Sequence, residues 1–394
     1  MPNVSRSEAG GQFNIWLSGD PLTRAKPSNH TVPLPGFQDQ DVQFARAFQI
    51  LHQAIQERAF PGVSLAVTHR RRLVLWKGLG RFTYDVESPG ISPVTIYDIA
   101  SVTKVVAATT MAMMLYERGK LDLEAPVVNF FPQFAVADST KCDVTIRMLL
   151  AHSSGLPAYE RLFQRALLRE DLIDLALTTP LAAPPGTRVE YSDIGFIILG
   201  EILGQIAGER IDQFCQREIF SVLDMSSTRY RPPIEWKQQI PPTVSDATFR
   251  RRVVQGEVHD ENASVMQGVS AHAGVFSSAL DLSGFAHCML NGGNPILKHE
   301  TVEFFTRREL FPEGTSRALG WDTPSVPSQS GGHLSSRAFG HLGYTGTSLW
   351  IDPERQLSIT MLTNRTWPDC TAQGIRRIRP QVHDAIVEAL NGGA

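Results

Sequence analysis

The chain has 394 residues, of which 42% are hydrophobic and 20% are charged. This composition is typical of a globular protein and excludes a wholly disordered chain, and the length suits two interlocked domains. Lys and Arg total 37 against 40 Asp and Glu, which gives a formal net charge of -3. This near-balance provides no electrostatic reason to expect nucleic acid or an anionic membrane surface as a partner.

Three features of the sequence bear on the compartment and the redox state. Residues 1–35 lack the charged-then-apolar pattern of a secretory signal, so we expect a cytoplasmic protein as the sequence stands, or a periplasmic one if a signal peptide was removed. No stretch approaches the roughly 20 apolar residues that a membrane span needs. The cysteines are scattered without C-x-x-C spacing, which favours isolated buried thiols over disulfides or a zinc site; they are Cys142, Cys215, Cys288 and Cys370.

The first half of the chain predicts an arm, a helix, a hairpin and a run of helices. Residues 1–40 are rich in Gly, Pro, Ser and Asn and predict an extended arm. Apolar residues at three- and four-residue steps predict an amphipathic helix, and two apolar runs around a short polar turn predict a β-hairpin. In chain order we expect the helix over 41–58, the hairpin strands over 62–68 and 73–76, a buried helix from 101 to a cap at 119, and helices within 120–265, most clearly over 193–207.

The last third of the chain predicts a helix, four strands and a final helix. These elements are expected over 280–290, then 319–322, 338–341, 347–351 and 357–362, and finally 381–390. Sheet elements at both chain ends around a helical middle predict an α/β (α+β) fold, an antiparallel sheet flanked by helices with an inserted all-α domain. The expected division is an arm over 1–40, a sheet domain over 41–104 and 266–394, and a mostly helical domain over 105–265.

Several common catalytic motifs are missing. There is no G-x-S-x-G elbow, no complete G-x-G-x-x-G, no Walker A loop and no H-E-x-x-H. The 11 histidines show no spacing typical of a metal site. We therefore expect neither a metal nor a cofactor.

The motif Ser101-Val-Thr-Lys104 predicts a nucleophile and its activating group. A serine hydroxyl is a weak nucleophile that needs a neighbouring base, and residues three apart on a helix share a face. The apolar run that follows would bury Lys104 and lower the pKa of its ammonium. The start of a helix also directs the N–H of Ser101 toward a site where an oxyanion would be stabilised. By itself the motif arises by chance in roughly one protein of this size, and the alternative is a Ser N-cap followed by an exposed Lys.

Two further segments strengthen this interpretation. Tyr191-Ser-Asp193 stands directly before an apolar helix, where the phenol could relay a proton to a leaving group. The Gly-rich segment from Phe339 to Gly346 follows an apolar strand, and small residues let a backbone N–H approach a substrate oxygen closely. Taken singly, Tyr191 could instead be a packing aromatic and His341 a surface residue.

Together these motifs resemble the penicillin-recognising serine hydrolase superfamily, which includes class C β-lactamases, serine D-Ala-D-Ala peptidases and esterases of the same fold. That superfamily orders its motifs as S-x-x-K, then Y-x-N or a variant, then K-T-G or H-x-G. The corresponding segments here are Ser101–Lys104, Tyr191–Asp193 and His341-Leu-Gly343, in that order. The segments 149–157 and 273–285 are similar to superfamily segments near the pocket. The resemblance covers about residues 41–390.

The resemblance implies a mechanism through an acyl-enzyme. Ser101 would attack the substrate carbonyl, and Lys104 and Tyr191 would share the proton transfers, without sequence deciding which is the base. The oxyanion hole would consist of the N–H groups of Ser101 and Tyr344. His341 would line the pocket beside Gly343 as a hydrogen-bond donor or a partial positive charge.

Two departures from the superfamily pattern shift the expected substrate. Asp193 replaces the Asn that β-lactamases direct toward the amide side chain of a β-lactam. His341 replaces the Lys that attracts a substrate carboxylate, and an imidazole is mostly neutral near pH 7. Both changes favour a carboxylesterase or a peptidase over a β-lactamase.

Three more residues are weaker candidates for the pocket. Tyr159 and Trp350 could form an apolar acyl pocket, although such aromatics are more often core residues. The segments 258–262 and 271–274 resemble a pocket edge in lactamase-like esterases and peptidases. Within the second, His272 could contact substrate, although a hydrogen-bonded interior histidine is the more common situation.

We therefore predict a serine hydrolase acting on small-molecule esters as a carboxylesterase, with possible weak β-lactam hydrolysis. The alternatives are a D-Ala-D-Ala carboxypeptidase acting on D-amino-acid peptides, a true β-lactamase, and a non-catalytic binding or sensor module on the same fold. The sequence predicts no oligomeric state.

Overall fold

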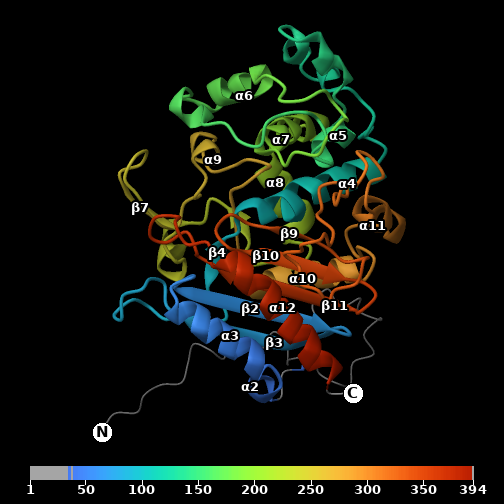
Figure 1. Ribbon diagram of the computed structural model, residues 1–394. Helices are drawn as coiled ribbons and strands as arrows, with labels where there is room; N and C mark the ends of the chain where they lie inside the picture. The colour runs from blue at the N-terminus through green and yellow to red at the C-terminus, as the bar shows by residue number, and fades with distance from the viewer. Residues whose placement is uncertain (1–33, 37–38, 393–394) are drawn as a thin grey trace.

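A six-stranded sheet forms the base of the molecule in the computed structural model, which describes residues 34–36 and 39–392 (Figure 1). Most of the predicted arm over 1–40 lies outside the described residues. The strand order is β1-β3-β2-β11-β10-β9; β1 pairs with β3 in parallel, and the other pairs are antiparallel. The strands are β1 (Leu34–Pro35), β2 (Gly62–His69), β3 (Arg72–Gly80), β9 (Phe339–Leu342), β10 (Ser348–Asp352) and β11 (Leu357–Thr363).

Helices cover both faces of this sheet. The helices α3 (Ala45–Gln56) and α12 (Ile375–Asn391) lie side by side on one face (Figure 1). They bury a core with alternate residues of β2 and β11, among them Val63, Leu65 and Ile359. The helix α10 (Ala279–Leu290) packs on the opposite face against β2, β10 and β11. The period-two alternation of the strands therefore supplies two separate apolar layers.

The middle of the chain is mostly helical and lies above the sheet in Figure 1. The helix α7 is apolar nearly all round, and it is accordingly buried along most of its length. The remaining α-helices are α2 (Gln40–Gln43), α4 (Thr110–Glu117), α5 (Ile146–Leu150), α6 (Arg169–Thr178), α7 (Asp193–Ala207), α8 (Ile211–Cys215), α9 (Glu261–Val265) and α11 (His299–Thr306).

Two small sheets accompany the six-stranded sheet. A three-stranded sheet has the order β4-β8-β5, and a hairpin joins β6 to β7. Strand β4 ends three residues before Ser101, so this sheet places the predicted nucleophile. The strands are β4 (Ile96–Asp98), β5 (Arg229–Tyr230), β6 (Val244–Asp246), β7 (Arg252–Val254) and β8 (Val275–Ser278).

The predicted mixture of helices and antiparallel strands is confirmed, with differences in several elements. The single helix expected from 101 to 119 is a 3-10 helix, a π-helix and α4 in succession. The helix expected over 41–58 is interrupted at Phe44 and forms α2 and α3. The prediction of a strand over 319–322 is wrong, because Gly320 adopts a φ of 82° and the chain turns there. The last helix starts earlier than expected and passes through Pro380. Proline there leaves the carbonyl of Arg376 without its helical N–H, and the side chain of Gln329 donates to it instead.

The remaining predictions concern membrane spans, cysteine pairing and domain boundaries. Within the described residues, no helix is long and apolar enough to cross a membrane. All four cysteines are unpaired, but Cys142 is exposed rather than buried. The domain boundaries proposed from the sequence stay a prediction.

Candidate active site

The predicted nucleophile lies just beyond the end of β4. Ala100 adopts a φ of 46°, a left-handed conformation that non-glycine residues rarely adopt. The buried carboxylate of Asp98 holds this turn, because its Oδ1 accepts from the N–H of Ala100 at 2.8 Å. A 3-10 helix, η1 (Ala100–Val102), follows and leaves Ser101 partly exposed. The hydroxyl of Ser101 is therefore available to a substrate on a locally constrained backbone.

Lys104 is fully buried behind Ser101. It begins a π-helix, η2 (Lys104–Thr109), that leads into α4. Its Nζ donates to Ser101 Oγ at 3.1 Å, to Asp193 Oδ1 at 2.6 Å and to the carbonyl oxygen of His272 at 3.1 Å. Three acceptors match the three N–H bonds of an ammonium group, so the site is built for the charged form of Lys104.

The expected pKa of Lys104 is therefore wrong in direction. Burial alone lowers the pKa of the ammonium, as the sequence suggested, but the charge of Asp193 and the contact with Tyr191 together outweigh burial. The net effect raises the pKa of Lys104 above its usual value. Asp193 lies 89 positions along the chain, so the apolar run after Lys104 gave no sign of it.

Tyr191 reaches Lys104 from the loop that precedes α7. Ser192 caps α7 by accepting from the N–H of Gly195, and the N–H of Ser192 donates to the ring Nδ1 of buried His152. These bonds hold the aromatic ring of Tyr191, whose centre lies 4.7 Å from Lys104 Nζ and 4.6 Å from the His152 ring. Burial raises the pKa of Tyr191, and contacts with Lys104 and Ser101 oppose it only in part. The resting phenol is therefore neutral.

His341 lies on β9 with its ring centre 5.9 Å from that of Tyr191. Its Nδ1 donates to the carbonyl oxygen of Leu342 at 2.7 Å, which leaves Nε2 as an unprotonated acceptor. Burial and the charges of Lys104 and Arg317 hold the pKa of His341 well below its usual value. The expectation of a donor or partial positive charge at His341 is therefore wrong, because the buried ring is neutral and its free nitrogen is an acceptor.

The turn after β9 brings the second predicted oxyanion-hole residue close to the nucleophile segment. Thr345 and Thr347 donate from their hydroxyls to the carbonyls of Asp98 and Ile99, both at 2.9 Å. Gly343 permits this approach, because a Cβ there would lie 2.6 Å from the carbonyl oxygen of Ile99. The N–H of Tyr344 has no hydrogen-bond acceptor within the described part of the chain. The turn therefore leaves the Tyr344 N–H available to a substrate oxygen.

The three weaker candidates have different positions. The hydroxyl of Tyr159 donates to Glu261 at 3.3 Å, and the residue is exposed at the edge of the site. Both ring nitrogens of His272 are hydrogen-bonded within the protein, so only its carbonyl oxygen contacts Lys104. Trp350 is paired with Gly340 in the sheet, whereas Leu349 is paired with His341. Because side chains alternate along a strand, Trp350 lies on the opposite face from His341, and its prediction as a pocket residue is wrong.

Sequence reasoning missed Arg317 as part of the site. Its guanidinium lies 5.4 Å from the ring centre of Tyr191, and its side chain is 19% exposed. An isolated arginine in a loop carries no sequence signal of this kind. Arg317 and Tyr191 lie far apart in the sequence, and only the fold brings them together.

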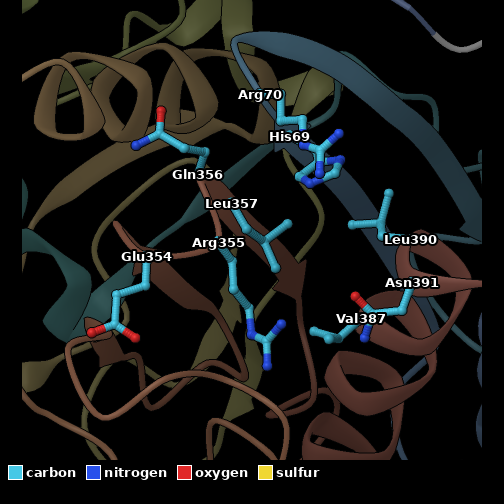
Figure 2. A pocket seen from close by; sticks show the side chains of 9 residues that line it. All are labelled: His69, Arg70, Glu354, Arg355, Gln356, Leu357, Val387, Leu390 and Asn391. Atoms are coloured by element: carbon cyan, nitrogen blue, oxygen red, sulfur yellow. The ribbon is translucent and has the colours of Figure 1, made fainter. Parts of the chain in front are cut away.

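A cavity of about 260 Å³ lies away from these residues, where the β2–β3 and β10–β11 turns meet the end of α12 (Figure 2). It opens to solvent and contains none of the predicted site residues. Its lining is His69, Arg70, Glu354, Arg355, Gln356, Leu357, Val387, Leu390 and Asn391.

A comparison with models of known protein families matches residues 47–382 to the family described as Beta-lactamase. The chain belongs to the beta-lactamase family. This membership confirms the resemblance predicted from the three motifs and establishes a serine hydrolase of the beta-lactamase fold.

Relatives of this beta-lactamase family member are named for different activities. This chain is 31% identical over 343 residues to a putative D-alanyl-D-alanine carboxypeptidase of Escherichia coli, and the alignment covers 78% of this chain and 79% of the relative. It is also 31% identical over 351 residues to an N-acetylmuramyl-L-alanine amidase of Bacillus subtilis, with 78% and 77% covered. The solved structure of EstCE1, a hydrolase with promiscuous acyltransferase activity, superposes with a TM-score of 0.72 at 21% identity and covers 89% of this chain and 100% of that one. That last likeness shows the fold alone.

Proposed function

We propose that this family member hydrolyses carboxylic esters through an acyl-enzyme on Ser101. The observation that carries the proposal is the 3.1 Å hydrogen bond between Lys104 Nζ and Ser101 Oγ, in a site where Tyr191 packs against the same ammonium. Acyl transfer to serine requires a nucleophile with an adjacent group that takes its proton, and a phenol can serve as a further proton-transfer group.

Acylation begins when Ser101 Oγ attacks the carbonyl carbon of the ester. The hydroxyl proton passes to the Lys104–Tyr191 pair, and the N–H groups of Ser101 and Tyr344 stabilise the oxyanion. The tetrahedral intermediate collapses, the bond to the alcohol oxygen breaks, and the pair returns the proton to that oxygen. Because Lys104 is charged at rest, the reaction requires the fraction of the pair that has lost a proton, and the rate increases with pH.

Deacylation repeats the same steps with water. A water molecule attacks the acyl carbonyl, and the Lys104–Tyr191 pair takes one of its protons. The bond to Ser101 Oγ then breaks, the oxygen recovers its proton, and the carboxylic acid leaves. The same oxyanion donors serve both half-reactions.

The preference for esters rests on two side chains. His341 is neutral, so it offers no positive charge to the carboxylate of a β-lactam or a peptide. Asp193 is engaged with Lys104 at 2.6 Å and has no amide N–H to donate to an acylamino side chain. An ester that carries neither a carboxylate nor an acylamino side chain therefore suits this site better than a β-lactam or a peptide does.

A D-Ala-D-Ala carboxypeptidase is the second candidate because of Arg317. Its guanidinium lies over Tyr191 beside the site and is partly exposed, with Asp322 3.7 Å away, and a guanidinium binds carboxylates well. The names of the Escherichia coli and Bacillus subtilis relatives, a carboxypeptidase and an amidase, support amide hydrolysis as well.

A substrate panel distinguishes these functions. A p-nitrophenyl ester, a chromogenic cephalosporin and a D-Ala-D-Ala peptide are compared on the wild-type protein and on Ser101→Ala. We expect the highest kcat/KM for the ester and no activity for Ser101→Ala. A peptide rate above the ester rate would favour the carboxypeptidase, and a faster cephalosporin rate would favour a β-lactamase. Inactivity on all three, together with no labelling of Ser101 by a fluorophosphonate, would favour a non-catalytic binding module.

A further inference from the structure

Two chains of hydrogen bonds start from adjacent residues, His259 and Asp260. One ends at Ala100, directly before Ser101, and the other ends at Lys104. We propose that this dipeptide is a positioning element that fixes Ser101 and Lys104 relative to each other. The inference rests on the proposed function, because it assumes that Ser101 is the nucleophile and Lys104 its partner. Neither His259 nor Asp260 needs to contact substrate in this role.

The first chain leads to Ser101. The backbone N–H of His259 donates to Asp98 Oδ2 at 2.6 Å, and the other oxygen of Asp98 accepts from the N–H of Ala100 at 2.8 Å. Ala100 adopts its left-handed φ of 46° directly before Ser101. Such a conformation persists only where the surrounding structure holds it. The carboxylate of Asp98 therefore transmits the position of His259 to the nucleophile.

The second chain leads to Lys104. Asp260 Oδ1 accepts from His272 Nε2 at 2.8 Å, and the carbonyl oxygen of His272 accepts from Lys104 Nζ at 3.1 Å. The hydroxyl of Ser270 bonds the other ring nitrogen of His272 at 2.7 Å, so the imidazole is held at both ends. The interaction with His272 contributes to holding the pKa of Asp260 at about 2 against its burial. The carboxylate stays charged, and its bond to His272 is a charge-assisted one.

The dipeptide is itself held from behind by Arg250. One guanidinium nitrogen of Arg250 donates to the carbonyls of Val258, His259 and Asp260 at 2.9, 3.2 and 3.3 Å. The buried side chain of Asp246 pairs with Arg250 at 3.4 Å. An anchored segment with a hydrogen bond toward each reacting group is well suited to fix their separation.

Small displacements of these groups have large effects on rate. A misplacement of about 1 Å by a change remote from the chemistry can cost about 100-fold in rate. A substrate is bound by other surfaces, so its KM depends much less on this element. The signature of a positioning role is thus a loss in kcat and in the reaction rate of Ser101, with KM and stability nearly unchanged.

The test compares two substitutions of Asp260. Asp260 also caps α9, because Oδ1 accepts from the N–H of Ala263 at 2.7 Å. In Asp260→Ser the hydroxyl can still cap the helix but is too short to reach His272, whereas Asp260→Asn keeps an acceptor oxygen at the same place. Asp138→Ser is the matched control, because Asp138 caps a surface 3-10 helix, η5 (Ser139–Asp143).

We expect Asp260→Ser to lower both kcat for a p-nitrophenyl ester and the rate constant for phosphonylation of Ser101 by about 10- to 100-fold. We expect KM within about 3-fold of wild type, and Asp260→Asn and Asp138→Ser within about 3-fold in rate. Wild-type rates for Asp260→Ser would overturn the inference, and so would an equal loss in Asp260→Asn. The folded fraction of each variant is measured by thermal unfolding. If the loss of rate in Asp260→Ser is fully explained by a smaller folded fraction, the inference is also overturned.

If Asp260→Ser does not fold, Asp98→Asn carries the test through the other chain. An Asn there can accept only one of the two N–H bonds that Asp98 accepts, so we expect a loss of about 10-fold or more in phosphonylation rate, and an unchanged rate would overturn the inference. Failure of the wild-type protein to react with the fluorophosphonate at Ser101 would instead contradict the proposed function.

Discussion

Lys104 Nζ lies 2.6 Å from Asp193 Oδ1, and the lysine side chain has no exposed surface. This ion pair joins the start of η2, which follows Ser101, to the start of α7, which follows Tyr191. It also decides the charge of the site, because the carboxylate keeps an ammonium in a place where burial would favour an amine. The position where β-lactamases have Asn is thus occupied by a group that sets the protonation of Lys104.

Asp193→Asn should move the acidic limb of the pH profile of kcat/KM to lower pH. Without the carboxylate, burial dominates and the pKa of Lys104 falls, so more of the lysine is neutral at a given pH. The profile with a p-nitrophenyl ester measures the shift. Glu190→Gln is the control, because Glu190 is paired with Arg188 on the surface. A limb that stays in place or moves to higher pH would contradict this assignment of the titrating group.

Tyr191→Phe should lower kcat by about 100-fold or more, because it removes the hydroxyl that shares the proton transfers while it keeps the packed ring. Steady-state rates on the ester measure the loss. Tyr84→Phe removes a surface hydroxyl that donates to the carbonyl of Arg58 and should retain wild-type rates. A fully active Tyr191→Phe would leave Lys104 as the only proton-transfer group.

Gly155→Ala should destabilise the protein much more than Gly119→Ala does. Both glycines have positive φ, 80° and 67° respectively. A Cβ at Gly155 would lie 2.1 Å from the backbone oxygen of Ala183, whereas a Cβ at Gly119 meets nothing within 4 Å. We expect about 1 kcal/mol for Gly119→Ala from its backbone conformation alone, and at least about 3 kcal/mol for Gly155→Ala. Urea unfolding measures both, and equal losses would contradict the close packing of this loop.

The buried carboxyl of Asp281 should make stability depend on pH. Burial raises the pKa of Asp281 to about 6, although Thr228 and Ser227 donate to it. Its contribution to the free energy of unfolding is therefore fully present below about pH 4 and is lost as the pH rises through 6, by about 3 kcal/mol. Asp281→Asn cannot titrate, so the unfolding free energy of wild type minus that of the variant should fall by this amount between about pH 4 and about pH 7.5. A constant difference in urea unfolding would show that the carboxyl does not titrate in this range.

Local patterns predicted a large part of this molecule. The amphipathic spacing of α3, the apolar run of α7 and the hairpin of β2 and β3 each record burial within one short segment. Ser101 and Lys104 could be paired because they lie three positions apart, which places both on one face of a helical turn. The order of the three motifs then indicated the family from the amino-acid sequence alone.

The errors share a physical cause, which is contact between residues distant in sequence. The pKa of Lys104 depends on Asp193, and the protonation of His341 depends on its burial beside Lys104 and Arg317. The sheet face of Trp350 depends on how β10 pairs with β9, because Leu349 rather than Trp350 is opposite His341. The bond between Asp260 and His272 joins two segments that the sequence indicated only as a pocket edge. None of these relationships leaves a period or a spacing in the chain.

The most direct test of the central claim is to find the residue that reacts with a fluorophosphonate. The wild-type protein is labelled, digested and analysed by peptide mass spectrometry, with Ser101→Ala treated in parallel. We predict one phosphonyl adduct, on Ser101, and none in Ser101→Ala. An adduct on a different residue, or undiminished labelling of Ser101→Ala, would contradict the assignment of Ser101 as the nucleophile.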